Sequence, residues 1–423
     1  MKRMAALGTV LLLAASTASG SCIGIAASAP AAEQDLIRKS LVKAGDMIDH
    51  INAADSMQLL SADETAEIDA KMAAYQAKED SLLRNKAENY YYYETLEGEA
   101  KQIYDVLLTV ASDPTTIDNY GLMMTTMDPS SEEFLFQYTV AYWSMVFDHP
   151  ELFWLYNTTE ISISYGSDGN NMNGIYLVYF GQDKAYENYY TEMEAFNSAA
   201  DEFLSHIDTG VSDYEIVKQV HDRLIQLVTY DDAVLEAGND GYYNLAHTAY
   251  GALVADSEGN ANYAVCDGYT LAMEYLLQQC GVEVVFNAGM AGRDELNAGG
   301  HAWNLVKLDG KWYELDSTWD DNEDWENDYT PSDQGYDYIM AAFHDADYAQ
   351  KLRHYLFLLS TERFRNFTPG DSLYFTASDG MTFTMLGDSV HVRFESDGTT
   401  KQSNAQASVL SNAPVAEESF AAE

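Results

Sequence analysis

The amino-acid sequence predicts an α+β protein in which a helix packs on an antiparallel sheet, behind an α-helical N-terminal region. Three observations support this fold class. Residues 33–93 contain one glycine and no proline and have a helix-forming composition. Apolar residues recur at helical spacing after Cys266. Two β-rich runs then flank Asp309-Gly310, a dipeptide typical of a tight hairpin.

Composition limits the class of protein. The chain has 423 residues, of which 47% are hydrophobic, enough for one large domain or two modest ones. Lys and Arg total 22 against 68 Asp and Glu, a formal net charge of -46. So acidic a surface repels polyanions, and we expect no nucleic-acid partner.

The N-terminus is typical of an exported protein. A short positive start and an apolar run over residues 4–15 form a secretory signal pattern, so we assign 1–29 to a signal peptide or lipoprotein leader. Two processing outcomes stay open. Cys22 lies where a lipoprotein carries its lipidated cysteine, whereas 27–29 offer a small-residue cleavage site. The protein is therefore expected at the cell surface or secreted, with a lipid anchor on Cys22 as its one expected membrane contact.

Secondary structure is predicted in order along the chain. A helix is expected over 131–147, ending before the proline that follows. Strand-like runs at 161–165 and 175–180 enclose a Gly/Asn-rich segment and predict a hairpin. A further helix is expected from about residue 185 to 207.

Domain boundaries follow from these elements. Residues 33–160 form the predicted helical N-terminal region, and 161–395 form the α+β domain, with its core at 212–365. Ser212 and Glu215 form a capping box that opens a helix in this core. Residues 396–423 carry few large apolar side chains and are predicted to be a disordered tail.

Beyond the leader, the chain has two cysteines, Cys266 and Cys280. On one helix they would lie ~21 Å apart, too far for a disulfide. Cys266 is then a free thiol at a helix N-terminus, where unpaired N–H groups favour the thiolate. Cys280 is expected to be a small buried apolar residue.

The hairpin register brings two further groups together. A two-residue loop makes Leu308 pair with Lys311, and counting back places His301 and Asp316 on one face as diagonal neighbours. Their Cβ atoms should lie ~7 Å apart, within reach of a hydrogen bond.

These residue types match cysteine acyl transfer. His301 would remove the thiol proton of Cys266, and Asp316 would fix the imidazole tautomer. The backbone N–H of Cys266 is the expected oxyanion donor. For a second donor, His247 and Tyr250 are candidates, although packing roles are the stronger expectation for both.

Four blocks in this order resemble the bacterial transglutaminase-like superfamily: 249–254, 265–269, 300–304 and 312–320. The clear resemblance covers 246–321, and a weaker one extends over 212–365. It implies a papain-like α+β core and a Cys-His-Asp catalytic triad. Members include transglutaminases, peptidases, peptide N-glycanases and proteins without activity, so the resemblance implies a reaction class and not a substrate. The loop at 255–264 is longer than usual in the family.

The predicted function is exported, cysteine-dependent acyl transfer on amide bonds through a thioester on Cys266. Such an enzyme is a hydrolase of the cysteine protease type, cleaving peptides or isopeptides at the cell envelope, or an acyltransferase that crosslinks through transglutamination. The expected partner is a protein or peptide, with cell-wall peptide among the candidates. No organic cofactor is needed.

Three alternatives were weighed. Cys266, His301 and Asp316 are zinc-ligand types, but paired ligand spacing is absent. The acidic segment 320–333 lacks the EF-hand spacing for calcium, so we expect a solvated loop. The rival from another class is a noncatalytic surface-binding module on an inactive scaffold, which the 31 tyrosines keep open.

Four further side chains near the predicted triad are assigned to structure. The three tryptophans Trp303, Trp312 and Trp319 are expected to be core residues, not a substrate platform. Asn304 is expected to hold the fold together.

Overall fold

The computed structural model describes residues 90–111, 121–125, 131–157, 160–165, 174–181, 189–236, 245–254, 262–322, 325–370 and 373–421. The predicted leader at 1–29, Cys22 and the helices expected between 33 and 89 lie outside these ranges, as does most of the loop at 255–264. Within them, no helix combines the length and apolar character that crossing a membrane requires.

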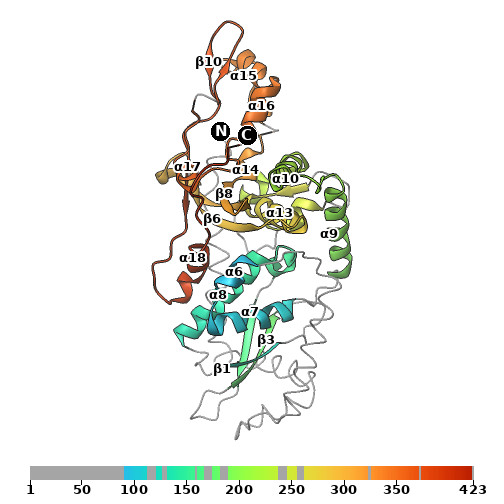
Figure 1. The fold of residues 1–423 in the computed structure, drawn as a ribbon, viewed down its shortest axis with the longest axis vertical. Helices are drawn as coiled ribbons and strands as arrows, with labels where there is room; N and C mark the ends of the chain where they lie inside the picture. Colours follow the sequence, from blue (N-terminus) through green and yellow to red (C-terminus); the bar gives the residue numbers. More distant parts are fainter. Residues whose placement is uncertain are drawn as a thin grey trace.

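The structure is a mixed α+β fold with an antiparallel sheet at its centre (Figure 1). The strand order is β11-β6-β7-β8, formed by Val390–Arg393, Val284–Gly292, Gly299–Leu308 and Lys311–Leu315. Helix α13, Cys266–Gln279, packs against β6 and β7. The cysteine-bearing helix therefore lies on the sheet that carries the predicted histidine.

The N-terminal region contains helices α6 (Tyr91–Thr95), α7 (Gly98–Ala111) and α8 (Glu132–Asp148), followed by the 3-10 helix η2 (Phe153–Asn157). It also contains strand β1, Gly121–Thr125, where the sequence predicted only helix. β1 joins the predicted hairpin, β2 (Glu160–Tyr165) and β3 (Gly174–Gly181), in a three-stranded antiparallel sheet. The hairpin prediction is confirmed, and this sheet spans the boundary expected at 160/161.

Serine caps fix the start of two predicted helices. Ser131 accepts a hydrogen bond from the Phe134 N–H at the start of α8, and Ser212 accepts one from the Glu215 N–H at the start of α10, Asp213–Leu227. Each cap satisfies an N–H that has no partner within the helix, an effect worth about 1 kcal/mol. Between them, α9 covers Tyr189–Leu204 within the predicted range.

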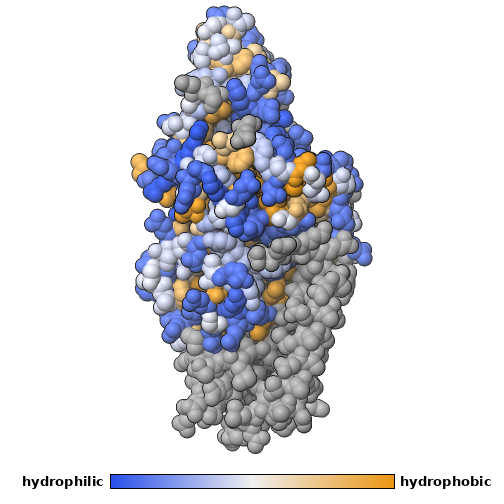
Figure 2. All heavy atoms as spheres, viewed as in Figure 1, coloured by the Kyte–Doolittle hydropathy of each residue, from blue (hydrophilic) through white to orange (hydrophobic). Residues whose placement is uncertain are grey.

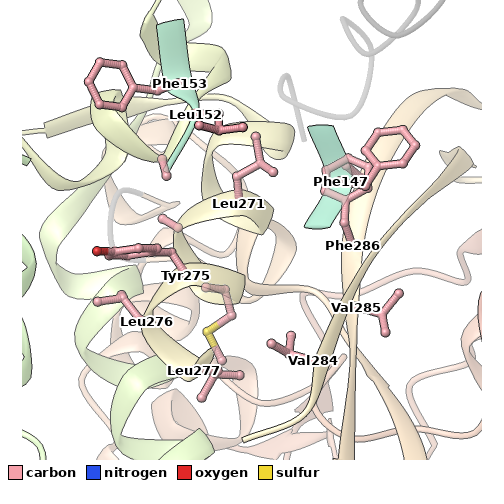
Figure 3. Close-up of a cluster of buried hydrophobic side chains, with 14 of the residues drawn as sticks. Phe147, Leu152, Phe153, Leu271, Tyr275, Leu276, Leu277, Val284, Val285 and Phe286 are labelled. Atoms are coloured by element: carbon pink, nitrogen blue, oxygen red, sulfur yellow. The ribbon is translucent and has the colours of Figure 1, made fainter. Parts of the chain in front are cut away.

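One hydrophobic core joins the N-terminal helices to the central sheet. Phe147 at the end of α8 stacks on Phe286 of β6, with ring centroids 4.6 Å apart and planes 6° from parallel. Figure 3 shows these rings together, with Leu152 and Phe153 approaching α13 near Leu271. Burial of each such side chain contributes on the order of 1.5–3 kcal/mol, so the two regions stabilise each other.

The remaining elements surround the sheet or extend beyond it. They are β4 (Val228–Tyr230), α11 (Asp232–Glu236), η3 (Leu245–His247), α12 (Ala249–Leu253), β5 (Asn262–Ala264), η4 (Glu295–Asn297), α14 (Ser317–Asp320), η5 (Trp325–Asp328), α15 (Tyr336–Phe343), α16 (Ala346–Leu352), α17 (Thr361–Arg365), β9 (Phe375–Thr376) and β10 (Thr382–Phe383). α15, α16 and β10 form the upper end of the molecule in Figure 1. A second hydrophobic cluster, which includes Trp303, Trp319 and Leu352, connects this end to the sheet.

The prediction of a disordered C-terminal tail is wrong for residues 396–421. They contain η7 (Gln402–Asn404) and helix α18 (Ala405–Leu410), which packs against α8. Val409 and Leu410 are each 1% exposed, and small residues such as Ala405 are buried beside them. Few large side chains are needed because alanines let the backbone approach closely, which composition alone does not reveal.

The described surface agrees with the acidic composition. Hydrophilic residues predominate on the face in Figure 2, with hydrophobic residues in small, separate groups. Leu296, at 96% exposure, is a single exposed apolar side chain of the kind that soluble proteins commonly carry.

Candidate active site

The β7–β8 hairpin has the predicted register. Leu308 pairs with Lys311, and the pairing continues to Asn304 opposite Leu315. Asp309 and Gly310 have φ values of 51° and 81°, the left-handed conformation that a two-residue hairpin loop needs. The loop therefore sets which face of the sheet each side chain of β7 and β8 occupies.

This register delivers the expected carboxylate–imidazole pair. Asp316 follows β8 directly, and its Oδ2 accepts a hydrogen bond from Nε2 of His301 at 2.6 Å. Both side chains are fully buried. The second oxygen of Asp316 accepts the N–H groups of Thr318 and Trp319 at 3.0 and 3.1 Å, so the same carboxylate caps α14.

Electrostatics hold Asp316 ionised. Burial favours the neutral carboxyl, but the charge of His301 and hydrogen bonds from His301 and His391 outweigh it and hold the pKa of Asp316 well below its usual value. Burial likewise opposes a charged imidazole, yet Asp316, with a smaller contribution from Cys266, raises the pKa of His301 to about 10. The pair therefore favours an imidazolium beside a carboxylate.

The thiol lies at the first position of α13, as predicted. The Val265 N–H donates to the Ala246 carbonyl at 2.9 Å just before it. A Cβ on Gly268 would lie 2.3 Å from that same carbonyl oxygen, so glycine is required in this turn. Together these contacts fix the peptide that carries Cys266.

Asn304 connects the strand of His301 to the helix of Cys266. Its side-chain amide donates to the Thr270 carbonyl at 3.1 Å, and Thr270 in turn donates its hydroxyl to the Cys266 carbonyl at 2.7 Å. Asn304 is fully buried. This link suits the structural role predicted for Asn304, and it equally joins the two elements of the candidate site.

Helix α13, which begins at Cys266, packs against β7, the strand of His301. The Cys266 thiol contributes, after Asp316, to the raised pKa of the imidazole. Nε2 of His301 is occupied by Asp316, which leaves Nδ1 for the thiol. Nδ1 is buried and makes no aligned hydrogen bond to another atom in the part of the chain that the structure describes. Such pairs often become aligned only when substrate binds. Cys266 is 2% exposed, so the thiol is enclosed in this conformation.

The sequence did not predict a second imidazole on Asp316. Nε2 of His391, in β11, lies 3.2 Å from Oδ2 of Asp316. The ring packs against Phe364 and Trp319, with centroids 4.3 and 4.6 Å away. Burial and the charge of His301 lower the pKa of His391, against the opposing effect of Asp316. His391 is thus expected to be a neutral donor to the carboxylate.

The two candidates for a second oxyanion donor have other partners. Nδ1 of His247 lies 2.9 and 2.8 Å from the two oxygens of Asp267, the residue after the thiol. Burial lowers the pKa of His247, but Asp267 outweighs this and raises it. The Tyr250 ring packs on Phe153, with centroids 4.7 Å apart.

The prediction of a solvated acidic loop is wrong for its first residues. Asp320 and Asp321 are 0% and 6% exposed. Asp321 accepts the Tyr269 hydroxyl at 2.6 Å, and Asp320 accepts the Leu356 N–H at 2.9 Å. Both carboxylates hold α14 in place. An acidic stretch in the sequence does not show which of its carboxylates are buried and hydrogen-bonded.

Predicted core residues near the site have different outcomes. Trp303 and Trp319 are buried at 1% and 7% exposure, whereas Trp312 is half-buried at the surface of the core. Cys266 and Cys280 are both free thiols, and Cys280 is half-buried against the core. The core assignment is therefore confirmed for Trp303 and Trp319.

Two groups of described side chains bring three possible metal-ligand atoms within 4.8 Å of one another: His301, Asp316 and His391, and His221, Asp222 and His354. In the first group all three side chains are fully enclosed, and backbone N–H groups of α14 hold one oxygen of Asp316 in place. These features suit a hydrogen-bonded triad better than a metal centre with an open position.

No family model matches the chain, and no curated protein matches it. A solved structure described as "Crystal structure of a TGase" is similar at 15% identity and a TM-score of 0.25, over 38% of this chain and 44% of that one. The match thus spans under half of the length of that chain.

Proposed function

We propose that this protein is an exported cysteine acyltransferase or amide hydrolase of transglutaminase-like, papain-like type. Cys266 is the nucleophile, His301 the general base and Asp316 the orienting carboxylate. The observation that carries the proposal is the buried 2.6 Å hydrogen bond between His301 and Asp316, on a sheet against which the helix beginning at Cys266 packs. A fully buried ion pair is costly unless the protein uses or compensates it, so its presence next to a free thiol favours chemistry.

The proposed reaction has two stages. In the resting site, Nδ1 of His301 already holds the thiol proton as part of the imidazolium, and the thiolate of Cys266 attacks the amide carbonyl carbon. The resulting oxyanion is stabilised by the Cys266 N–H, which has no partner within the first turn of the helix. The C–N bond then breaks, the departing amine takes the proton from His301, and a thioester remains on sulfur.

The second stage releases the acyl group. Water or a primary amine attacks the thioester carbonyl while His301 accepts its proton, and the C–S bond breaks to restore the thiolate. Water gives hydrolysis of a peptide or isopeptide, whereas an amine gives a crosslink. We propose hydrolysis at the cell envelope as the first reaction, on a protein or peptide substrate, and amine transfer as the second.

A noncatalytic binding module is the second candidate, and one observation favours it. Cys266 is only 2% exposed, so an acyl donor must displace neighbouring structure before it reaches sulfur. An inactive scaffold would have no need for that opening.

Alkylation as a function of pH separates the two candidates. Iodoacetamide labelling of Cys266 is followed by peptide mapping from pH 5 to 9, with Cys280 at the other end of α13 as the internal reference. In the catalytic proposal His301 holds the thiol proton and leaves sulfur nucleophilic, so we expect Cys266 to react at pH 6, where a thiol without such a base reacts slowly. His301→Gln should return Cys266 to the profile of Cys280.

A wild-type profile for Cys266 that already matches that of Cys280 would contradict the catalytic proposal and favour the binding module. The choice between water and amine as acceptor follows from incubating the reactive protein with a glutamine peptide and a labelled primary amine. Incorporated label indicates transfer, and free carboxylate indicates hydrolysis.

A further inference from the structure

A second cluster of metal-ligand side chains lies away from the thiol, where α10 meets the turn after α16. Oδ1 of Asp222 lies 3.2 Å from Nδ1 of His221 and 2.5 Å from Nε2 of His354. The three candidate ligand atoms all lie within 4.8 Å of one another. For metal–ligand bonds of 2.0–2.2 Å, tetrahedral ligands are separated by about 3.3 Å, so small side-chain shifts would accommodate an ion.

The opposite nitrogen of each imidazole faces an acceptor. Nδ1 of His354 lies 2.8 Å from the Gln350 carbonyl oxygen, which can only accept, so this nitrogen carries the hydrogen. Nε2 of His221 lies 3.2 Å from Oδ2 of the buried Asp320, although the two atoms are not aligned for a hydrogen bond, so the hydrogen-bonded acceptor is shown for His354 alone. Acceptors in these positions are typical of metal-binding histidines, because they fix the tautomer that directs a lone pair at the ion.

We propose that His221, Asp222 and His354 form a binding site for a divalent transition metal, with Zn²⁺ as the expected ion. Two imidazoles and one carboxylate supply three ligands, and water would complete the tetrahedron. The side chains of Asp222 and His354 are 27% and 16% exposed, so an ion can enter from solvent. This openness distinguishes the site from the enclosed His301–Asp316 pair.

Lys218 distinguishes a metal site from the alternative, a network of ion pairs without a metal. Its Nζ lies 2.5 Å from Oδ2 of Asp222, so an ammonium group shares the carboxylate. The alternative is a network of ion pairs without a metal, because Asp222 and Asp320 raise the pKa of His221 against the opposing effect of burial. In a metal site Lys218 competes with the ion, whereas in an ion-pair network it only adds a favourable contact.

The site is independent of Cys266 but connected to the candidate active site. Asp320, which lies near His221, is the last residue of helix α14, and Asp316 is the N-cap residue of the same helix. Leu356, two residues after His354, donates its N–H to Asp320 and accepts the Asp316 N–H at 3.1 Å. A bound ion would hold α10, α14 and the turn after α16 together.

Zinc binding is tested in a Cys266→Ala background, which removes the thiol of the candidate active site as a competing zinc ligand and makes the result independent of the proposed function. Chelator-treated protein is titrated with Zn²⁺ against a fluorescent competitor, and bound metal is counted by mass spectrometry. We expect one Zn²⁺ per chain and a rise in melting temperature with Zn²⁺. His354→Gln and Asp222→Asn should each lower the affinity more than ~100-fold, and Asp320→Asn about 10–100-fold.

Two control variants sharpen the result. His206→Gln removes an exposed histidine, 50% accessible, near the end of α9, and should leave the affinity unchanged. Lys218→Met should bind Zn²⁺ as tightly as the parent or more tightly. Circular dichroism and thermal melting in the presence of chelator identify any variant that fails to fold. If His354→Gln or Asp222→Asn does not fold, the zinc affinity of the other variant tests the proposal.

Three outcomes would overturn the proposal. They are stoichiometric Zn²⁺ binding that survives His354→Gln and Asp222→Asn, no Zn²⁺ bound by the folded parent, and loss of binding through His391→Phe alone. The last would place the metal on the Asp316 cluster.

Discussion

Asp316 has two tasks at once, since one oxygen caps α14 and the other accepts the imidazoles of His301 and His391. Four donors to one carboxylate leave it little freedom to rotate. The position of the base is therefore tied to the start of a helix, which is more rigid than a loop.

His391 should position the carboxylate without taking part in proton transfer. His391→Phe keeps an aromatic ring among Phe364 and Trp319 and removes one donor from Asp316. We expect the alkylation rate of Cys266 at pH 6 to fall less than 10-fold, with the shape of the pH profile retained. Asp316→Asn, which disrupts the tautomer, should slow the same alkylation far more, because the corresponding change in a serine triad costs on the order of 10⁴-fold in rate.

Equal losses for His391→Phe and Asp316→Asn would contradict a positioning role and indicate that His391 exchanges protons with the site. Rates measured on the folded variants with the same electrophile provide the comparison.

The sequence predicts side-chain pairs that a short loop controls. His301 and Asp316 are 15 residues apart across a two-residue turn, so counting the register was sufficient. His391 is 75 residues beyond Asp316 and reaches it through the pairing of β11 with β6. Local sequence patterns cannot predict a contact between residues so far apart in the sequence. The proximity of His221 to Asp320 could not be predicted for the same reason.

At the scale of elements, one carboxylate holds several helices. Asp148 at the end of α8 accepts the N–H groups of Tyr92 and Tyr93 at 3.0 and 2.8 Å, and so caps α6 from a distance. It also accepts the Tyr104 hydroxyl of α7 at 3.0 Å. Burial raises the pKa of Asp148 to about 6, although these donors and His149 oppose the shift.

Asp148→Ala should destabilise the fold by about 2–4 kcal/mol, because buried donors lose their acceptor. The difference from wild type should also depend on pH. The folded pKa, about 6, exceeds the ordinary value of 3.8, so this part of the stability is present below pH 3.8 and lost as pH rises through 6. Urea unfolding at pH 4, 5, 6 and 7 should therefore show the largest difference at pH 4.

Gln102→Ala, at an exposed position on α7, is the matched control and should stay within about 0.5 kcal/mol of wild type. A gap between wild type and Asp148→Ala that widens toward pH 7 would show that the carboxyl is stabilised as the ion.

Helices with serine caps were predictable, whereas β1 was not. Ser131 and Ser212 mark helix starts in the sequence itself, and both act as caps. Gly121–Thr125 contains consecutive leucine and methionines without period-two alternation, and such residues favour helix. Pairing with β3 overrides that preference, because ladder hydrogen bonds decide the conformation of a short segment.

At the scale of the molecule, the C-terminal segment returns to the N-terminal helices. The Tyr91 hydroxyl donates to the Asn412 carbonyl at 2.9 Å, and the Gln402 N–H donates to Glu132 at 3.2 Å. α18 lies beside α8 (Figure 1). Residues over 300 positions apart thus belong to one packed unit.

Leu410→Ala should cost about 2–5 kcal/mol, since it leaves a cavity in the shared core. Val415→Ala, at a side chain 62% exposed, is the control and should change stability by less than about 0.5 kcal/mol. Chemical unfolding monitored by tryptophan fluorescence measures both. A Leu410→Ala variant as stable as wild type would mean that this segment is dispensable for the fold.

The extent of this core was beyond prediction from composition. Residues 396–421 lack the large side chains that announce a buried segment, and their partners lie in α8 and the central sheet. By contrast, the α+β class and the antiparallel pairing followed from local turn and periodicity signals. Mutual burial of distant segments is the part of the fold that a linear reading leaves out.

The enclosed position of Cys266 has a kinetic consequence. A buried sulfur reacts only while the structure around it is locally open. In each opening, the reaction with a reagent competes with reclosing of the structure. At high reagent concentration the rate of labelling therefore reaches a maximum equal to the rate of opening, whatever the intrinsic nucleophilicity of the thiolate. A compound that binds and stabilises the open conformation would raise this maximum rate. A natural acyl donor with that property would promote its own access to the thiol.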